Sequence, residues 1–351
     1  MRAIVLRTPG DPEVLRVDDA PDPRPDAGEA IVRLQAAALN HRDVWIRKGR
    51  YAGITLPIIL GSDGAGEVVE TGADVDSSWR GREVVIDPTL HWGHDERVQG
   101  PRFEILGLPR NGTYAELVKV PAANLHDKPR HLSFEEAAAV PLASLTAYRA
   151  LVRRAQVKAD ETVVVTGIGG GVATCALLIG TRLGARVYVT SGSDVKIHTA
   201  RRHGAAGGVN HHDPDWPKAL IAHIGDRPDI VIDGAGGETF NQALDLVKPG
   251  GRVVSYGATL GPAPNVEVRR IFWKQVNVLG STMGSPSDFA GMLGLYAEET
   301  APLAPLTPHR AGAVGTPLRP IVDSVVPLDQ AAEAHRRMED GKQCGKIVLK
   351  I

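Results

Sequence analysis

The sequence predicts an α/β protein of two domains, one mainly antiparallel and β-rich and the other built on a doubly wound parallel sheet. Up to about residue 125, short β-rich runs are separated by Pro and Gly clusters such as Pro21-Asp-Pro-Arg-Pro25. From about residue 160, wholly apolar strands alternate with helical segments, which is typical of a parallel sheet covered on both faces. A chain of 351 residues is also long enough for about two domains.

The expected strands of the first domain are MRAIVL, EAIVRLQAAAL, GAGEVVETG, GREVVIDP and TYAELVKVP. After them, Ser133-Phe-Glu-Glu136 has the spacing of a capping box ahead of an alanine run, so we expect a helix that Pro141 ends. The chain closes with a helix around AAEAHRRMEDG and the strand KIVLKI. Because so short a tail makes a poor separate domain, we expect it to return to the first one.

The expected strands of the second domain are TVVVTG, RVYVTSG, GGVNHH, PDIVIDGAG, GRVVSYG and VNVLGSTMG, and a helix is expected after each of the first four. The first strand runs through TGIGGGVA directly into a helix, the context that a dinucleotide fingerprint requires. Glycines let the backbone approach a pyrophosphate, whose charge is met by the amides at the helix N-terminus. Ala173 replaces the last glycine of the strict motif. The alternative to a cofactor site is that this glycine cluster forms only an ordinary turn. The turn residues expected to bind the cofactor are Gly169, Gly170, Gly171 and Val172.

The end of the second strand of this sheet predicts which cofactor is bound. An NAD enzyme usually carries an acidic residue there for the ribose hydroxyls, whereas this chain has Ser191. Asp194 is close but begins the next helix, where it is suited to the helix dipole. Without a carboxylate to repel a 2′-phosphate, and with Lys196, Arg201 and Arg202 nearby as possible cations, the sequence favours NADPH over NADH; the alternative is that these three residues are solvated helix charges.

Composition and charge exclude several classes of function. Lys and Arg number 40 against 41 Asp and Glu, so nothing draws the whole chain to nucleic acid or to anionic lipid. The start of the chain has neither a signal-peptide core nor a membrane-length apolar segment, which predicts a cytoplasmic protein. Two cysteines, Cys175 and Cys344, make neither a disulfide framework nor a four-thiolate zinc site.

The motifs "LGSDGAGEVVETG", "GTYAELVKVP", "PLASLTAYRAL", "TGIGGGVA", "VKPGGRVVSYG" and "GKIVLKI" together resemble the medium-chain dehydrogenase/reductase superfamily over essentially the whole chain. "FWKQVNVLGSTMG" and the lack of metal ligands look closest to the quinone oxidoreductase-like branch and to its zinc-type alcohol dehydrogenase-like relatives. The resemblance implies a GroES-like catalytic domain, 1–128 and 285–351, and a Rossmann dinucleotide-binding domain, 129–284. It also implies a homodimer, for which VNVLGSTMG is either the pairing edge or an interior strand.

Zinc-dependent members of that superfamily bind the catalytic metal through two cysteines and a histidine. At the matching positions this chain has Asn40, Ser62 and Leu142, and Asp63 stands where such enzymes carry a glutamate. None of the three is a good zinc ligand, and a catalytic site needs about three protein ligands. The lobe after residue 87 also lacks the four cysteines of a structural zinc site; its His91 and His94 are read as part of a polar loop rather than as an adventitious metal site.

Without zinc to stabilise an alkoxide, the favoured reaction is hydride transfer to a quinone or an α,β-unsaturated carbonyl, whose added charge spreads to an oxygen held by hydrogen-bond donors. The expected donors are Asn40, Tyr51 and Ser62. Each also has a purely structural alternative: Asn40 fixes its loop, Tyr51 packs against its neighbours, and Ser62 forms hydrogen bonds with nearby backbone groups. Thr146 and Gly257 are expected to line the cofactor. A zinc-type alcohol dehydrogenase and a non-catalytic NADPH-binding protein, such as a sensor or a crystallin-like relative, are the competing hypotheses.

Overall fold

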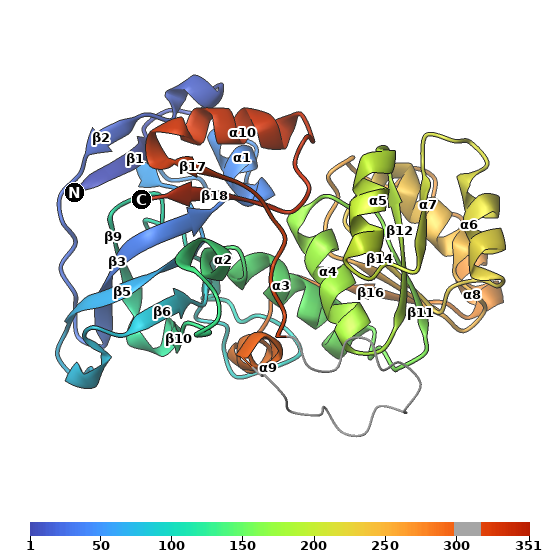
Figure 1. Cartoon of the computed structure of the whole chain (residues 1–351), viewed down its shortest axis with the longest axis horizontal. Helices are drawn as coiled ribbons and strands as arrows, with labels where there is room; N and C mark the ends of the chain where they lie inside the picture. Colours follow the sequence, from blue (N-terminus) through green and yellow to red (C-terminus); the bar gives the residue numbers. More distant parts are fainter. Residues whose placement is uncertain (298–316) are drawn as a thin grey trace. The chain divides into compact units, whose positions relative to one another are not determined.

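The computed structural model describes residues 1–297 and 317–351, which form two compact units (Figure 1). The first unit comprises Met1–Ala143, Ser285–Leu293 and Arg319–Ile351. The second comprises Ser144–Gly284 and the described residues of the segment from Gly294 to Leu318. Of the tail expected to belong to the first domain, 298–316 lie outside the described residues.

The first unit is built around strand β3 (Glu29–Ala38), which is long enough to pair with three partners. On one side it pairs with β5 (Asp63–Thr71), and on the other it pairs with β9 (Leu117–Pro121) and β18 (Lys346–Lys350), all antiparallel. The sheet order is β10-β6-β5-β3-β18-β17, and β1 lies between β2 and β4 in a smaller sheet. The other strands are β1 (Arg2–Leu6), β2 (Val17–Asp19), β4 (Ile58–Ile59), β6 (Glu83–Ile86), β7 (Thr89–Leu90), β8 (Glu104–Ile105), β10 (Leu125–Asp127) and β17 (Val322–Pro327).

The tail returns to this unit as the sequence predicts. β18 completes the sheet beside β3, and β17 pairs in parallel with β18. Helix α10 (Ala331–Glu339) buries Ala331, Ala334 and Met338 in the same apolar core as β1 and β4. The remaining helices of this unit are α1 (His41–Arg47), α2 (Phe134–Ala138), α9 (Pro286–Ala297), which continues past the unit boundary, and the short η1 (Pro12–Val14), η2 (Ser77–Trp79), η3 (Ala122–Asn124) and η5 (Leu328–Gln330).

The capping box at Ser133 is confirmed. The Ser133 hydroxyl accepts the Glu136 N–H at 3.2 Å, and the Glu136 carboxylate accepts the Ser133 N–H at 3.0 Å. Helix α2 stops at Ala138, and Pro141 begins a second helix, α3 (Pro141–Tyr148), where its missing N–H costs no hydrogen bond. A π-helical turn, η4 (Arg149–Arg154), follows α3.

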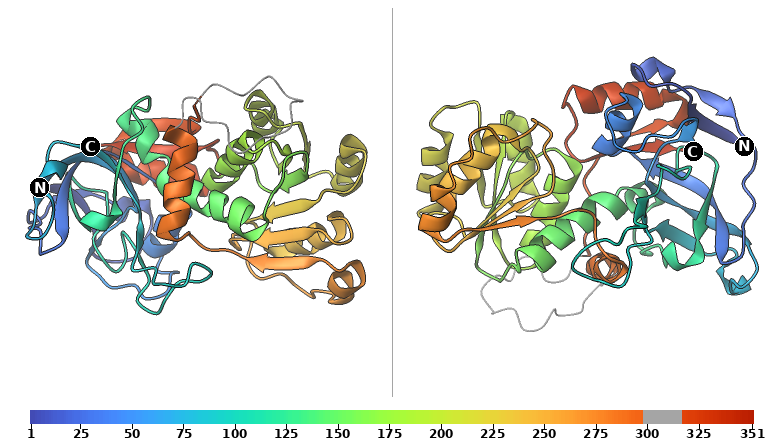
Figure 2. Two further views of the ribbon diagram at one scale, coloured as in Figure 1. Left: turned by 90° about the horizontal axis from the view of Figure 1, so that it is seen from below. Right: turned by 180° about the vertical axis from the view of Figure 1, so that it is seen from behind.

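The second unit is the predicted parallel sheet, with the strand order β13-β12-β11-β14-β15-β16. Order along the chain reverses between β11 and β14, the point at which such sheets bind ligands. Figures 1 and 2 show helices on both faces of the sheet. Its strands are β11 (Thr162–Val165), β12 (Arg186–Ser191), β13 (Gly207–Asn210), β14 (Ile230–Asp233), β15 (Arg252–Ser255) and β16 (Asn277–Gly280). Its helices are α4 (Gly171–Arg182), α5 (Asp194–Arg202), α6 (Trp216–Ile224), α7 (Gly237–Leu246) and α8 (Arg269–Lys274).

Strands β11 and β14 are buried along their whole length, which explains their continuous apolar sequence. Among the described residues, no helix is long and apolar enough to cross a membrane.

Candidate functional site

The glycine turn of the second unit joins β11 to α4 as predicted. Gly167 and Gly169 have φ of +67° and +119°, a backbone region that side chains other than glycine rarely adopt. Gly170 is the N-cap of α4 and has no side chain to cap it, and Gly171 and Val172 open the helix. The N–H groups of a first helical turn have no partner within the helix. The turn therefore presents unpaired donors to an anion.

Ser191 holds the glycine turn in place from the neighbouring strand. Its hydroxyl, only 4% exposed as a residue, donates to the carbonyl of Ile168 at 3.3 Å and accepts the N–H of Ser193 at 3.2 Å. The Ile168 N–H in turn bonds the carbonyl of Thr190 at 2.7 Å. The structure therefore gives Ser191 an anchoring role; whether it also contacts a cofactor stays a prediction.

Asp233, at the end of β14, was not singled out from the sequence, although it is a carboxylate that ends an apolar strand. It is fully buried and accepts the Thr166 hydroxyl at 2.7 Å and the N–H groups of Ala235 and Gly236 at 3.1 and 3.0 Å. Burial raises the pKa of the nearby Tyr256 phenol, and the charge of Asp233 raises it further. Asp233 thus fixes the ends of β11 and β14, where the chain order reverses.

The other residues predicted to contact the cofactor lie at different points of the second unit. Gly257 lies just after β15. Its backbone packs so closely against Gly234 that a Cβ on Gly257 would lie 3.0 Å from the carbonyl oxygen of Gly234. Thr146 is buried in α3, and Lys196 lies in the first turn of α5. Arg201 and Arg202 lie in the last turn of α5, roughly 10 Å along the helix from Asp194. Of the three proposed cations, Lys196 alone is near the end of β12.

In the first unit, the amide of Asn40 is held between two charged side chains. Asn40 Oδ1 accepts a hydrogen bond from the Lys346 ammonium at 2.7 Å, and its Nδ2 donates to the Asp63 carboxylate at 2.9 Å. Lys346 also bonds Asp63 at 2.8 Å and the carbonyl of Leu39 at 2.7 Å. Because Lys346 only donates and an ionised Asp63 only accepts, the amide has one orientation. One Nδ2 hydrogen of Asn40 remains beyond the hydrogen bond to Asp63.

Asp63 connects this cluster to the third position at which zinc-dependent relatives have a ligand. Its second oxygen accepts the N–H of Leu142 at 2.8 Å, and its side chain is fully buried. The three positions therefore carry an amide, a hydroxyl and an apolar side chain, and the acidic neighbour is paired with an ammonium. A zinc ion does not fit this set. Among the described residues, no group of three or more His, Cys, Asp and Glu side chains is arranged to bind a metal.

Ser62 and Tyr51 are linked through Arg42, which was not singled out from the sequence. The Ser62 hydroxyl donates its only proton to the carbonyl of Leu106 at 2.7 Å and accepts from Arg42 Nη1 at 2.6 Å. Arg42 Nη1 also bonds the Leu106 carbonyl at 2.8 Å. The Arg42 guanidinium lies 5.2 Å from the ring centroid of Tyr51, a cation–π distance. Ser62 thus satisfies a backbone carbonyl, which is the alternative role given to it above, whereas the ring of Tyr51 packs against Arg42.

Beneath Asn40, a second carboxylate fixes the loop. Asp43 accepts the Asn40 N–H at 2.8 Å and the Tyr114 hydroxyl at 3.0 Å. Burial raises the pKa of Asp43, against the lowering effects of Arg42 and these donors. The backbone and the side chain of Asn40 are therefore both held by buried polar groups. For brevity we call Asn40, Asp63 and Lys346 the amide cluster.

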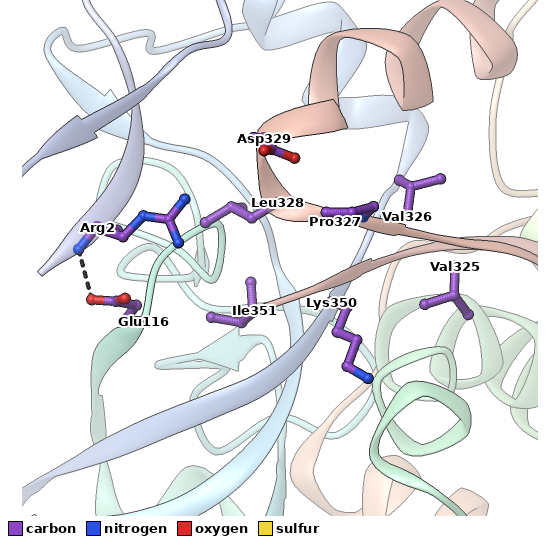
Figure 3. Close-up of a pocket in the computed structure, with 9 residues that line it drawn as sticks. All are labelled: Arg2, Glu116, Val325, Val326, Pro327, Leu328, Asp329, Lys350 and Ile351. Carbon is purple, nitrogen blue, oxygen red and sulfur yellow. Dashed lines mark hydrogen bonds between the residues drawn. The ribbon is translucent and has the colours of Figure 1, made fainter.

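A groove of about 350 Å³ lies elsewhere in the first unit, between β17, the end of β18 and Arg2 (Figure 3). It is lined by Val325, Val326, Leu328 and Ile351 together with scattered charges, and the Arg2 N–H bonds Glu116 at 2.7 Å. Lys350, at its edge, is four residues along β18 from Lys346, a distance of about 13 Å. The groove is thus separate from the amide cluster.

Comparisons with known proteins agree with this architecture. Residues 26–130 match the alcohol dehydrogenase GroES-like domain, and residues 171–298 match the zinc-binding dehydrogenase family. The chain is 35% identical to a zinc-type alcohol dehydrogenase-like protein of Leptosphaeria maculans, over 96% of this chain and 94% of that one. It is 28% identical to a quinone oxidoreductase of Pongo abelii, over 99% of this chain and 97% of that one. A crystal structure of an NAD-dependent alcohol dehydrogenase, 41% identical, superposes with a TM-score of 0.91 over both whole chains.

Proposed function

Because the chain belongs to the medium-chain dehydrogenase/reductase superfamily of oxidoreductases, we propose that it is an NADPH-dependent, zinc-independent reductase of quinones or α,β-unsaturated carbonyl compounds. One observation carries the proposal. At one of the positions where zinc-dependent relatives bind metal, Lys346 and Asp63 hold the Asn40 amide and leave it one oriented amide hydrogen.

The second unit supplies the cofactor site of the proposed enzyme. Gly169, Gly170, Gly171 and Val172 would hold the pyrophosphate at the N-terminus of α4, and Thr146, Gly257 and Lys196 would complete the site. When bound, NADPH supplies a hydride. The preference for NADPH rests on the lack of a carboxylate at the end of β12, where Ser191 stands.

The first unit supplies the donor to the substrate. When a quinone or enone is reduced, negative charge grows on its oxygen, and an oriented N–H there stabilises that charge without reorganising. Lys346, at the oxygen end of the Asn40 amide, polarises the N–H groups and prevents the amide from turning over. Tyr51 is the candidate second donor, because its hydroxyl has no hydrogen-bond partner among the described residues.

An NAD-dependent alcohol dehydrogenase is the second candidate, favoured by the name of the 41% identical structure. Zinc-independent alcohol oxidation would require another group to stabilise the alkoxide, and the amide cluster offers a neutral donor in place of a divalent cation. Chelation distinguishes the two candidates. Dialysis against EDTA should leave the activity and the Tm of the reductase unchanged, whereas stoichiometric zinc in the purified protein would favour the alcohol dehydrogenase.

We further propose that the protein is a homodimer through β16. This strand ends the sheet of the second unit and pairs on one side with β15 within the described part of the chain. Near it, Val268, Phe272 and Trp273 are 61%, 62% and 79% exposed. An exposed edge strand beside apolar side chains is suited to antiparallel pairing with a second copy.

The proposed function is tested by titrating the purified protein with NADPH and NADH, followed by adding a quinone, an enone and a simple ketone. We expect tighter binding of NADPH and oxidation of NADPH by the conjugated acceptors alone. Reduction of the simple ketone at an equal rate would contradict the role given to conjugation. Binding of NADPH without turnover by any acceptor would support a non-catalytic NADPH-binding protein.

A further inference from the structure

Two adjacent imidazoles lie over the backbone that follows β12. A Cβ built on Gly192 would lie 2.5 Å from Nε2 of His212 and 3.2 Å from Nε2 of His211. The two rings are nearly perpendicular, at 76°, with their centroids 5.1 Å apart. Because Gly192 directly follows Ser191, the nitrogen edges of both rings fill the space that a side chain at this point would take.

This is the point at which a sheet of this type distinguishes the two dinucleotides. An acidic residue here binds the ribose hydroxyls of NAD, and a basic one accommodates the 2′-phosphate of NADP. The Asp194 carboxylate accepts the amide of Asn210 at 3.0 Å. The backbone N–H of His211 donates a hydrogen bond to the carbonyl of Ser191 at 2.9 Å, which fixes the start of the histidine pair beside the end of β12.

We propose that His211 and His212 bind the 2′-phosphate of NADPH, so that the preference for NADPH over NADH weakens as the pH rises above neutrality. The proposal rests on the dinucleotide site proposed above. A ribose phosphate is dianionic above its second pKa of about 6, and protonated imidazoles are donors at both ring nitrogens. Gly192 is the residue that makes room for them.

The charges around the pair determine the sign of this pH dependence. Partial desolvation lowers the pKa of His211, and the neighbouring His212 lowers it further, so the surroundings in the free protein favour the neutral His211 imidazole. The charged groups on the flanking segments are Asp194 and Lys196 on α5, and Asp213, Asp215 and Lys218 after β13. Asp215 pairs with Lys218 at 2.7 Å. A phosphate dianion bound beside His211 favours the protonated imidazole, so NADPH binding takes up protons and weakens as the pH rises.

Calorimetry in two buffers that differ in ionisation enthalpy measures this proton uptake directly. Between about pH 7 and about pH 8.5 the phosphate stays dianionic, so any change in NADPH affinity comes from the protein. We expect proton uptake with NADPH at pH 7, none with NADH, and an affinity for NADPH that falls over this range by about tenfold for each pH unit and bound proton. The affinity for NADH should stay flat.

The double variant His211→Gln/His212→Gln keeps polar side chains but removes the titration. It should bind NADPH about tenfold more weakly or worse, with no proton uptake and with NADH affinity unchanged. Gly192→Ala, which directs a methyl group at His212, should weaken NADPH in the same direction. His223→Gln, exposed on α6, is the matched control and should bind both dinucleotides like the wild type.

Three results would overturn the inference. If NADPH is preferred without proton uptake and the preference disappears in Lys196→Gln but survives in the double variant, Lys196 binds the phosphate instead. If NADH is preferred, the inference and the NADPH assignment fail while the dinucleotide site stands. If neither dinucleotide binds, the proposed function itself fails.

Discussion

Asn40 and Ser62 show how hydrogen bonding separates two residues that the sequence offered for one role. The single hydroxyl proton of Ser62 goes to the carbonyl of Leu106, whereas Asn40 keeps one amide hydrogen beyond those its partners use. A donor in the reaction must have a proton to give to the substrate oxygen. The geometry therefore favours Asn40 and leaves Ser62 a role in stability.

Replacing each of these residues by alanine should separate the two roles. Asn40→Ala should lower kcat for a quinone or enone by about 10²- to 10³-fold, the loss seen when one oxyanion donor is removed. Ser62→Ala should lower the free energy of unfolding by about 1–3 kcal/mol, because a buried carbonyl and Arg42 lose a partner, while kcat changes little. Steady-state kinetics and urea unfolding measure the two effects. Equal losses of kcat would show that Ser62 also acts on the substrate.

Lys346 and Asp63 form a buried ion pair, so the effects of substituting them on the free energy of unfolding should be strongly coupled. Lys346→Met leaves the Asp63 carboxylate buried without its cation, which should cost about 3–5 kcal/mol of stability. Adding Asp63→Asn removes the uncompensated charge, so the double variant should recover part of this loss. Urea unfolding of the two single variants and the double variant gives the coupling energy. Purely additive losses would mean that the two charges do not stabilise each other.

At the scale of elements, the long loop between β7 and β8 is attached to the start of α9 by a carboxylate. Glu96 accepts hydrogen bonds from the hydroxyls of Ser285 and Ser287, the latter at 2.6 Å. Ser285 also caps α9, since its hydroxyl accepts the N–H of Asp288 at 3.2 Å. In this chain, which lacks the cysteines of the structural zinc site, Glu96 helps to hold the lobe.

Glu96→Ala should therefore increase amide hydrogen exchange in the loop around Trp92 to Phe103 and at the start of α9. Loss of hydrogen bonds to a charged group corresponds to a local stability loss of about 1.5–3 kcal/mol. Glu135→Ala, at a half-buried position on α2, serves as a control on an unrelated acidic side chain. Unchanged exchange in the loop would mean that other contacts hold it.

Much of the element order is predictable from periodicity, because strands such as β3 and β11 bury faces that the sequence already shows as apolar. The capping box at Ser133 and the glycine turn before α4 are likewise local signals. The two-residue strands β4, β7 and β8 exist only through their partners, so no local pattern marks them. The amide cluster joins residues 40, 63 and 346, which only the folded chain brings together; the one local signal available was Lys346, a cation directly before the apolar residues of KIVLKI.

At the scale of the whole molecule, β16 and β17 are two terminal strands that each carry an exposed valine, and we expect only β16 to bind a second copy. β16 and β17 each end their sheet, and Val278 and Val325 on them are 41% and 45% exposed. Beside β16, however, Phe272 and Trp273 extend the apolar surface, and a symmetric dimer needs one such self-complementary patch.

Val278→Lys and Val325→Lys are therefore a matched pair of variants with opposite expected outcomes. A lysine on β16 of each copy would face like charge across the twofold axis, which disfavours pairing. Light scattering coupled to gel filtration should find the wild type and Val325→Lys dimeric and Val278→Lys monomeric at micromolar concentration. Trp273 fluorescence adds an independent readout, because an indole that is 79% exposed in one chain should shift to shorter wavelength only where the dimer covers it. A monomeric wild type, or a dimer that only Val325→Lys dissociates, would rule out β16 as the pairing edge.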